Sequence, residues 1–139
     1  MALGRILALD LGKRRIGLAL SDELGITAQG LKTLERTNLR EDLARLAKLV
    51  SQHNVTLIVM GNPLHMSGRE GRGTEHARAF GARLQAATAI PVELWDERLT
   101  TVQAQRVLRE SGVSIEKRAK AVDRLAAVIL LESYLDSRR

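Results

Sequence analysis

The sequence predicts an α/β fold in which a mixed five-stranded sheet is flanked by helices on both faces. Two short apolar runs, 5–11 and 15–20, are joined by the turn "GKRR", which is typical of a β-hairpin. Two later apolar runs, "VTLIVMG" at 55–61 and "PVELW" at 91–95, alternate with helical patterns, as parallel strands do. The length of 139 residues predicts a single domain over residues 1–139.

The remaining elements of the first half follow from local spacing. Segment 27–34 completes a three-stranded antiparallel unit with the hairpin. Asn38 and Glu41 then have the spacing of a capping box, which marks the start of a helix. The apolar residues of that helix recur at helical spacing: Leu39, Leu43, Leu46 and Val50.

The second half combines a loop, one strand and three helices. The stretch 61–74, "GNPLHMSGREGRGT", contains four glycines and is predicted to be a basic loop. A helix over 100–111 is expected to end at Gly112, and residues 119–137 form a last, strongly apolar helix. The first helix of this half has one apolar face, made of Ala77, Phe80, Leu84 and Ala87.

The composition excludes several classes of function. The chain has no cysteine, which rules out disulfides, zinc ribbons and thiol catalysis and agrees with a cytoplasmic location. No apolar run is long enough to cross a membrane, and no export signal is visible at the start. A net charge of +6 favours a polyanionic partner, although a basic solvated surface would give the same charge.

Acidic residues occur in three segments where burial would be costly. Asp10 ends the first apolar run, and its alternative role is to cap the turn that follows. Asp96 and Glu97 come directly after the strand "VELW", where one of them could serve as a helix cap. Asp123 falls on the apolar stripe of the last helix, where Lys120 is its alternative salt-bridge partner.

Carboxylates that converge from separate segments repel one another, and divalent cations are the usual compensation. Oxygen ligands favour Mg²⁺ or Mn²⁺. Together with a basic rim, such a cluster suits phosphodiester cleavage with two ions, one activating water and the other stabilising the leaving oxygen. The sequence therefore predicts a candidate site at the carboxyl ends of the central strands.

Four sequence blocks carry a family resemblance: "ALDLGKRRIGLALSD", "VMGNPLHMSGREG", "DERLTT" and "VDRLAAVILLESYL". In this combination and order, from Asp10 to Tyr134, the chain resembles the YqgF/RuvX family, which is similar to RuvC-type Holliday-junction resolvases. The resemblance implies an RNase H-like fold and a metal-dependent nuclease. It also implies a bacterial cytoplasmic role in maturing the 5′ end of pre-16S ribosomal RNA, with DNA-junction resolution in recombination and repair as the alternative.

The acidic positions that match the family are Asp10, the Asp96-Glu97-Arg98 block and Asp123. Resolvases place their second acid at the end of the fourth strand, but "LIVMGNP" has no carboxylate there, so Asp96 or Glu97 must substitute. Neighbours in an extended segment point to opposite faces, and the choice between these two stays open. Asp96 lies closer to the strand, and Glu97 has the longer reach. The expected catalytic residues are Asp10, Asp96, Glu97 and Asp123, and the expected metal ligands among them are Asp10, Glu97 and Asp123.

Basic residues in two more places are expected to contact nucleic acid. In the family resemblance, Arg14 and Arg98 match basic positions that touch the scissile phosphate. Arg69 and Arg72, in the glycine-rich loop, either hold backbone phosphates or are solvated loop charges.

A further basic cluster, Lys117, Arg118 and Lys120, is expected to form a loop that tracks the nucleic-acid backbone. The expected partner is a structured RNA, with a four-way DNA junction as the alternative. A resolvase needs two sites for two opposed strands, so the chain is expected to be a monomer or a homodimer. Two other interpretations stay open: a non-catalytic RNA-binding module and, from "DLGKRRIG", an actin-like phosphotransferase, for which 139 residues supply only one lobe.

Overall fold

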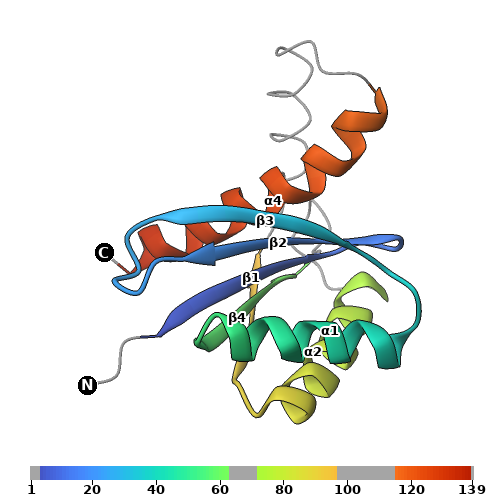
Figure 1. Ribbon diagram of the computed structural model, residues 1–139, viewed down its shortest axis with the longest axis horizontal. Coiled ribbons are helices and arrows are strands. Elements are labelled where there is room, and N and C mark those ends of the chain that lie inside the picture. Colours follow the sequence, from blue (N-terminus) through green and yellow to red (C-terminus); the bar gives the residue numbers. More distant parts are fainter. Residues whose placement is uncertain (1–3, 63–71, 97–114, 139) are drawn as a thin grey trace.

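The computed structural model describes residues 4–62, 72–96 and 115–138 of the chain. Its elements, shown in Figure 1, are β1 (Arg5–Leu11), β2 (Arg15–Ser21), β3 (Ala28–Glu35), α1 (Leu39–Gln52), β4 (Val55–Asn62), α2 (Arg72–Thr88), β5 (Val92–Asp96) and α4 (Ile115–Ser137). The helix expected over 100–111 lies outside the described residues. Among the described helices, none is long and apolar enough to cross a membrane.

The predicted strands and the start of α1 are confirmed. Each strand lies within one residue of its predicted bounds. The Asn38 side chain accepts a hydrogen bond of 2.9 Å from the Glu41 N–H, as an N-cap does. The Glu41 carboxylate accepts a bond of 2.7 Å from Thr37 Oγ1, which adds a second contact at the helix start.

The prediction for the loop over 61–74 is wrong at both ends. β4 continues to Asn62, and α2 begins at Arg72, so this arginine opens a helix instead of lying in a loop. The acidic Glu75 in the first turn favours a helix start here, because a negative charge complements the dipole of the helix.

The prediction of a basic loop before the last helix is also wrong. α4 begins at Ile115, so Lys117 and Arg118, with the rest of that segment, belong to the helix. Glu116, Lys117 and Arg118 are good helix formers, and neither glycine nor proline separates Ile115 from the apolar part of the helix.

The five strands form the predicted mixed sheet, and their order in it is β3-β2-β1-β4-β5. β1 pairs antiparallel with β2, and β2 with β3, whereas β4 runs parallel to β1 and β5 parallel to β4. Strands β1, β4 and β5 therefore end at the same edge. We call this the carboxyl edge; Asp10, Asn62 and Asp96 mark it, and the register sets Asn62 directly opposite Asp96.

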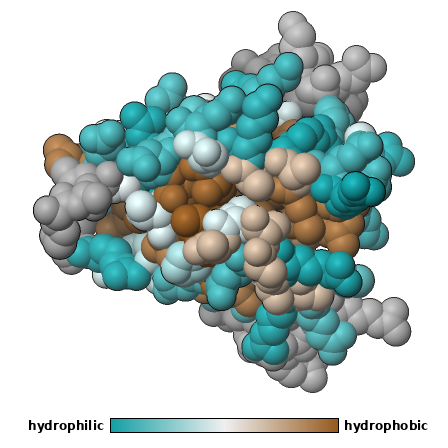
Figure 2. All heavy atoms as spheres, turned by 60° about the horizontal axis from the view of Figure 1, so that its bottom comes forward, coloured by the Kyte–Doolittle hydropathy of each residue, from teal (hydrophilic) through white to brown (hydrophobic). Residues whose placement is uncertain are grey.

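Helices cover both faces of the sheet (Figure 1): α1 and α2 lie together on one face, and α4 crosses the other. The core on the first side is rich in large residues, including Leu9, Leu46, Met60 and Phe80. Seen from the side of α1 and α2, apolar side chains gather in the middle of the surface between hydrophilic ones (Figure 2). The core beneath α4 is smaller and includes Ala8, Ala19, Ala127, Leu130 and Leu131.

Alternation along β1 decides which way Asp10 faces. Leu7 and Leu9 belong to the core beneath α1 and α2, whereas Ala8 belongs to the core beneath α4. Successive residues of a strand point to opposite faces, so Asp10 shares the face of Ala8. Asp10 therefore lies on the side of the sheet that α4 covers.

Candidate functional site

Asp10 lies one residue before the end of β1 and is half-buried, as expected of an acidic residue at the carboxyl end of this strand. Its cross-strand partner is Gly17, which brings no side chain to the face that the two residues share. A carboxylate in such a place has lost part of its hydration, and a nearby positive charge stabilises its ionised form.

Asp96 is the last residue of β5 and is exposed. Leu94 packs in the core beneath α1 and α2, and Trp95 in the core beneath α4. By the same alternation, Asp96 lies on the face opposite to that of Asp10. Strands β1 and β5 thus bring Asp10 and Asp96 to the same edge of the sheet, but the two side chains lie on different sides of it.

Asn62 adds an oxygen to the carboxyl edge that the sequence analysis did not single out. Among the described residues, its Oδ1 atom is buried without a hydrogen-bond partner. Buried amide oxygens normally accept a bond, and oxygen atoms of carboxylates and amides are the ligands that Mg²⁺ and Mn²⁺ prefer. By alternation from Met60, Asn62 shares the side of Asp96 and lies opposite to Asp10. Taken by their chemistry, these oxygen atoms fit a hard divalent cation.

Two side-chain hydrogen bonds fasten α4 to β5. Trp95 Nε1 donates to Ser133 Oγ at 3.1 Å, and the Tyr134 hydroxyl donates to Glu93 Oε2 at 3.0 Å. The Trp95 and Tyr134 rings meet edge to face with their centroids 5.3 Å apart. Burial raises the pKa of Tyr134, and the bond to Glu93 raises it further, so the hydroxyl remains a donor at neutral pH. These contacts fix the rotation of α4 against the sheet.

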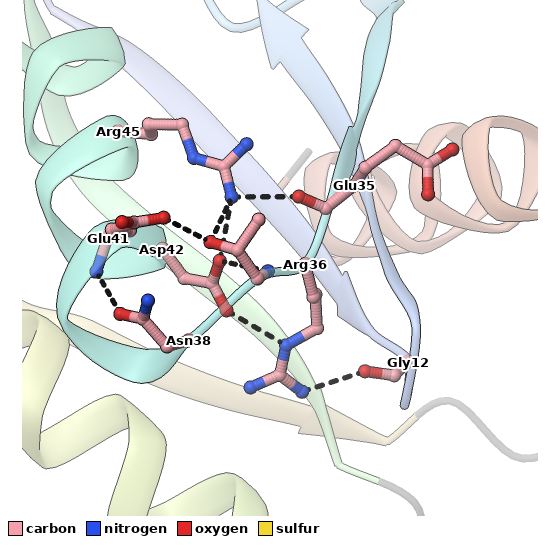
Figure 3. A network of polar contacts seen from close by, with 8 residues as sticks. Gly12, Glu35, Arg36, Asn38, Glu41, Asp42 and Arg45 are labelled. Atoms are coloured by element: carbon pink, nitrogen blue, oxygen red, sulfur yellow. Dashed lines mark hydrogen bonds and ion pairs between the residues drawn. The ribbon is translucent and has the colours of Figure 1, made fainter.

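The turn that follows Asp10 is held from the side of α1 (Figure 3). Arg36 Nη1 donates to the Gly12 carbonyl oxygen at 2.9 Å. The Gly12 N–H donates to the Arg15 carbonyl oxygen, also at 2.9 Å. A Cβ atom at Gly12 would come within 2.6 Å of that same Arg15 oxygen, so the turn requires glycine at this position.

Arg36 is itself positioned by Asp42, whose side chain is 1 % exposed. Asp42 Oδ2 accepts from Arg36 Nε at 3.2 Å, and Oδ1 accepts from Arg45 Nη2 at 2.8 Å and from the Thr37 N–H at 3.1 Å (Figure 3). Burial alone would raise the pKa of Asp42, but these hydrogen bonds outweigh it and hold the pKa below its ordinary value. We call Arg36, Asp42 and Arg45 the Asp42 brace.

A groove of about 600 Å³ opens beside the same turn, on the side of α1 and α2. Its four basic lining residues come from three segments, the β1–β2 turn, the chain after β3 and helix α2: Lys13, Arg36, His76 and Arg83. Apolar side chains also line it: Leu11, Leu39, Ala77, Ala79 and Phe80. Among the described residues that line the groove, none is acidic. The basic residues of the groove are scattered along the chain, so no local sequence pattern marks it.

Of the other predicted site residues, one lies in the β1–β2 turn, one lies on α4, and the rest are outside the described residues or have side chains that are. Arg14 is exposed in the turn between β1 and β2, and Asp123 lies on α4 one turn before the buried Ala127. Within the described parts of the chain, no three acidic or histidine side chains come together as a metal site. The remaining predictions concern residues or side chains outside the described part: Arg69, Arg72, Glu97, Arg98, Lys117, Arg118 and the Asp123 carboxylate.

Known proteins match this chain over nearly its whole length. The sequence matches the RuvX family, described as Holliday junction resolvase, over residues 4–137. The chain belongs to the RuvX family. A relative from Koribacter versatilis, named as a candidate pre-16S rRNA nuclease, is 58% identical over 135 residues, which cover 97% of this chain and 88% of the relative. A relative from Myxococcus xanthus with the same name is 48% identical, with 97% and 89% of the two chains covered.

Solved structures similar to this RuvX chain show an RNase H-like nuclease fold. RuvC of Thermus thermophilus in complex with a Holliday junction substrate has a TM-score of 0.58 at 15% identity, covering 97% of this chain and 95% of that one. A fowlpox virus resolvase in complex with Holliday junction DNA also has a TM-score of 0.58 at 15% identity, covering 96% and 98%. The fold expected from the family resemblance is therefore confirmed.

Proposed function

We propose that this RuvX protein is a divalent-cation-dependent endonuclease that processes the 5′ end of pre-16S rRNA in the bacterial cytoplasm. The observation that carries the proposal is the position of Asp10, half-buried at the carboxyl edge on the side that α4 covers. The names of the curated relatives support pre-16S rRNA as the substrate. In this proposal, residues 1–139 act as one nuclease domain, as a monomer or a homodimer.

Asp10, Glu97 and Asp123 are the proposed ligands for Mg²⁺ or Mn²⁺. Alternation along β5 supports Glu97 over Asp96. Trp95 faces α4 and Asp96 faces away, so one more extended residue would turn the next side chain back to the face of Asp10.

The direction of α4 supports Asp123 as the third ligand. α4 runs opposite to β1 (Figure 1), and Ala127 packs in the same cluster as Ala8. From Ala127 back to Asp123 the helix advances about 6 Å. From Ala8 on to Asp10 the strand advances about 7 Å toward the same edge. The direction of α4 thus supports Asp123, which precedes Ala127 by one turn, as a ligand near the carboxyl edge.

When bound, two divalent cations at such a site activate the attacking water and stabilise the leaving oxygen. The carboxylates hold the cations, and the arginine side chains position the substrate. Arg14, exposed in the turn beside Asp10, and Arg98 are proposed to contact the scissile phosphate. The nucleic-acid backbone on either side is proposed to contact Arg69, Arg72, Lys117 and Arg118.

The test is to incubate a labelled pre-16S 5′-leader RNA and a synthetic four-way DNA junction with the protein in Mn²⁺, Mg²⁺ or EDTA. The proposal expects RNA cleavage with either cation, no cleavage with EDTA, and none by Asp10→Asn. Paired symmetric nicks in the junction alone would show a DNA resolvase instead. RNA binding without any cation-dependent cleavage would show a non-catalytic RNA-binding module.

A further inference from the structure

The groove lined by Lys13, Arg36, His76 and Arg83 has a place in the proposed reaction but lies outside the predicted set of site residues. We propose that it binds one unpaired nucleotide of the RNA strand that flanks the cleavage point. The inference rests on the proposed function, because it names a binding subsite for the same substrate.

The lining of the groove combines the two chemistries of a nucleotide. Lys13 and Arg83 are exposed cations that suit a phosphate, and no acidic residue is among the described residues that line the groove. Its apolar walls suit the face of a base. A volume of about 600 Å³ is in the range of pockets that hold small ligands. A bare phosphate would leave the apolar walls exposed to water, so a nucleotide fits the groove better than an inorganic anion.

Arg36 supplies a fixed flat surface in this groove. Its Nε and Nη1 atoms are held by Asp42 and the Gly12 carbonyl, and its guanidinium lies over the Phe80 ring, 5.6 Å from the ring centroid. Unpaired RNA bases stack on aromatic rings or on guanidinium planes. The chain has three aromatic residues, and two of them, Phe80 and Tyr134, are buried. Arg36 is therefore the stacking surface that the groove offers.

The position of the groove fits a nucleotide next to the cleavage point. The groove is lined by Gly12, which lies two residues after Asp10. Two residues of extended chain span about 7 Å, which is close to the distance that one nucleotide covers along a strand. Leu11 lines the groove from the side of the sheet opposite to Asp10, so a strand would pass over the β1–β2 turn to reach it. A paired base cannot enter such a pocket, and the proposal therefore requires an unpaired nucleotide.

The absence of cysteine from the chain allows a direct test by crosslinking. Ala79 lines the groove and is exposed, so Ala79→Cys can carry a photo-crosslinker on a unique thiol. Gln52→Cys, exposed at the far end of α1, is the matched control. Both are made in the Asp10→Asn background, so that the RNA stays intact. We expect the crosslinker at residue 79 to attach to an unpaired leader nucleotide, and the control to give no comparable product.

A charge-removal series gives a second readout. Lys13→Gln and Arg83→Gln are each expected to lower the affinity for RNA with an unpaired flank and to reduce the slope of log affinity against log salt by about 0.7. Lys48→Gln, which removes an exposed charge elsewhere on α1, should leave both quantities unchanged. Affinity for a blunt RNA duplex should not respond to the groove variants.

The outcomes separate this inference from the proposed function. If the parent protein cleaves the RNA but residue 79 crosslinks no more than residue 52, and the groove variants bind like Lys48→Gln, the groove is not a nucleotide site. If the parent neither cleaves nor binds the RNA, the proposed function fails and the groove must be judged with another nucleic acid. Crosslinking that a blunt duplex competes away as well as a single strand would also overturn the inference.

Discussion

Two regions of the molecule hold carboxylates away from water, and they do so in opposite ways. In the Asp42 brace, a carboxylate that is 1 % exposed is neutralised by two arginines and a backbone N–H of the same chain. At the carboxyl edge, Asp10 is half-buried on the side of the sheet opposite to Asp96, and an amide oxygen of Asn62 is buried without a partner among the described residues. The brace neutralises its buried carboxylate within the chain, whereas the carboxyl edge carries oxygen atoms that we propose bind a divalent cation.

The largest expected effect comes from Asp10→Asn. This change keeps the shape of the side chain and removes its charge from the carboxyl edge. We expect cleavage to fall by at least roughly 10²–10³-fold, the range for losing one charge-stabilising group at a reaction centre. The thermal midpoint should stay near that of the parent, because asparagine keeps the size and shape of the half-buried side chain. Single-turnover cleavage and thermal unfolding measure the two quantities.

Glu23→Gln is the matched control for that experiment. Glu23 is exposed in the turn between β2 and β3, at the opposite end of the sheet, so its charge has no part in the site. The Glu23→Gln variant should therefore cleave the RNA at the rate of the parent protein. Equal activity of the Asp10 variant and this control would contradict the assignment of the carboxyl edge as the active site.

The second expected effect, on stability, comes from Asp42→Asn. The change leaves Arg36 and Arg45 without their shared carboxylate, and it should lower the free energy of unfolding at pH 7 by about 2 kcal/mol. Urea unfolding measures this loss. Cleavage per folded molecule should change far less than in Asp10→Asn. If Asp42→Asn is as stable as the parent, the Asp42 brace does not stabilise the fold. If it loses cleavage as fully as Asp10→Asn, the brace is as important for cleavage as the carboxyl edge.

The pH dependence of that loss tests the charge of Asp42 directly. Hydrogen bonds from Thr37, Arg36 and Arg45 outweigh the effect of burial and lower the pKa of Asp42 in the folded protein. Its stabilising effect is therefore fully present above the unfolded pKa of about 3.9 and is lost as pH falls through the lower, folded pKa. The difference in stability between parent and Asp42→Asn should be constant from about pH 5 to 8 and shrink below about pH 4. A difference that instead grew toward acid would mean that Asp42 is neutral in the folded protein.

The contrast between the regions also explains what the sequence could predict. Strands and the α1 start depend on neighbours close in the chain, such as Asn38 and Glu41, and these were predicted within a residue. The carboxyl edge was also predictable, because it needs only the order and direction of the strands. The brace itself joins residues close in the chain, but its contact with the turn after Asp10 was not predictable, since Arg36 reaches Gly12 across 24 positions. The basic segment before α4 was misjudged because its charges suggested a loop, while its helix propensity favoured a helix.

The smallest expected effect concerns the contact between α4 and β5. Tyr134→Phe removes the hydrogen bond from Tyr134 to Glu93 but keeps the ring that packs against Trp95. We expect a loss of about 1 kcal/mol in the free energy of unfolding, measured in urea. The Asp42 brace lies on the other face of the sheet, so the double variant with Asp42→Asn should show the sum of the two losses within about 0.5 kcal/mol. A larger deviation would mean that α4 and the brace respond to each other through the sheet. In that case the carboxyl edge between them could not be treated as independent of the residues that stabilise the fold.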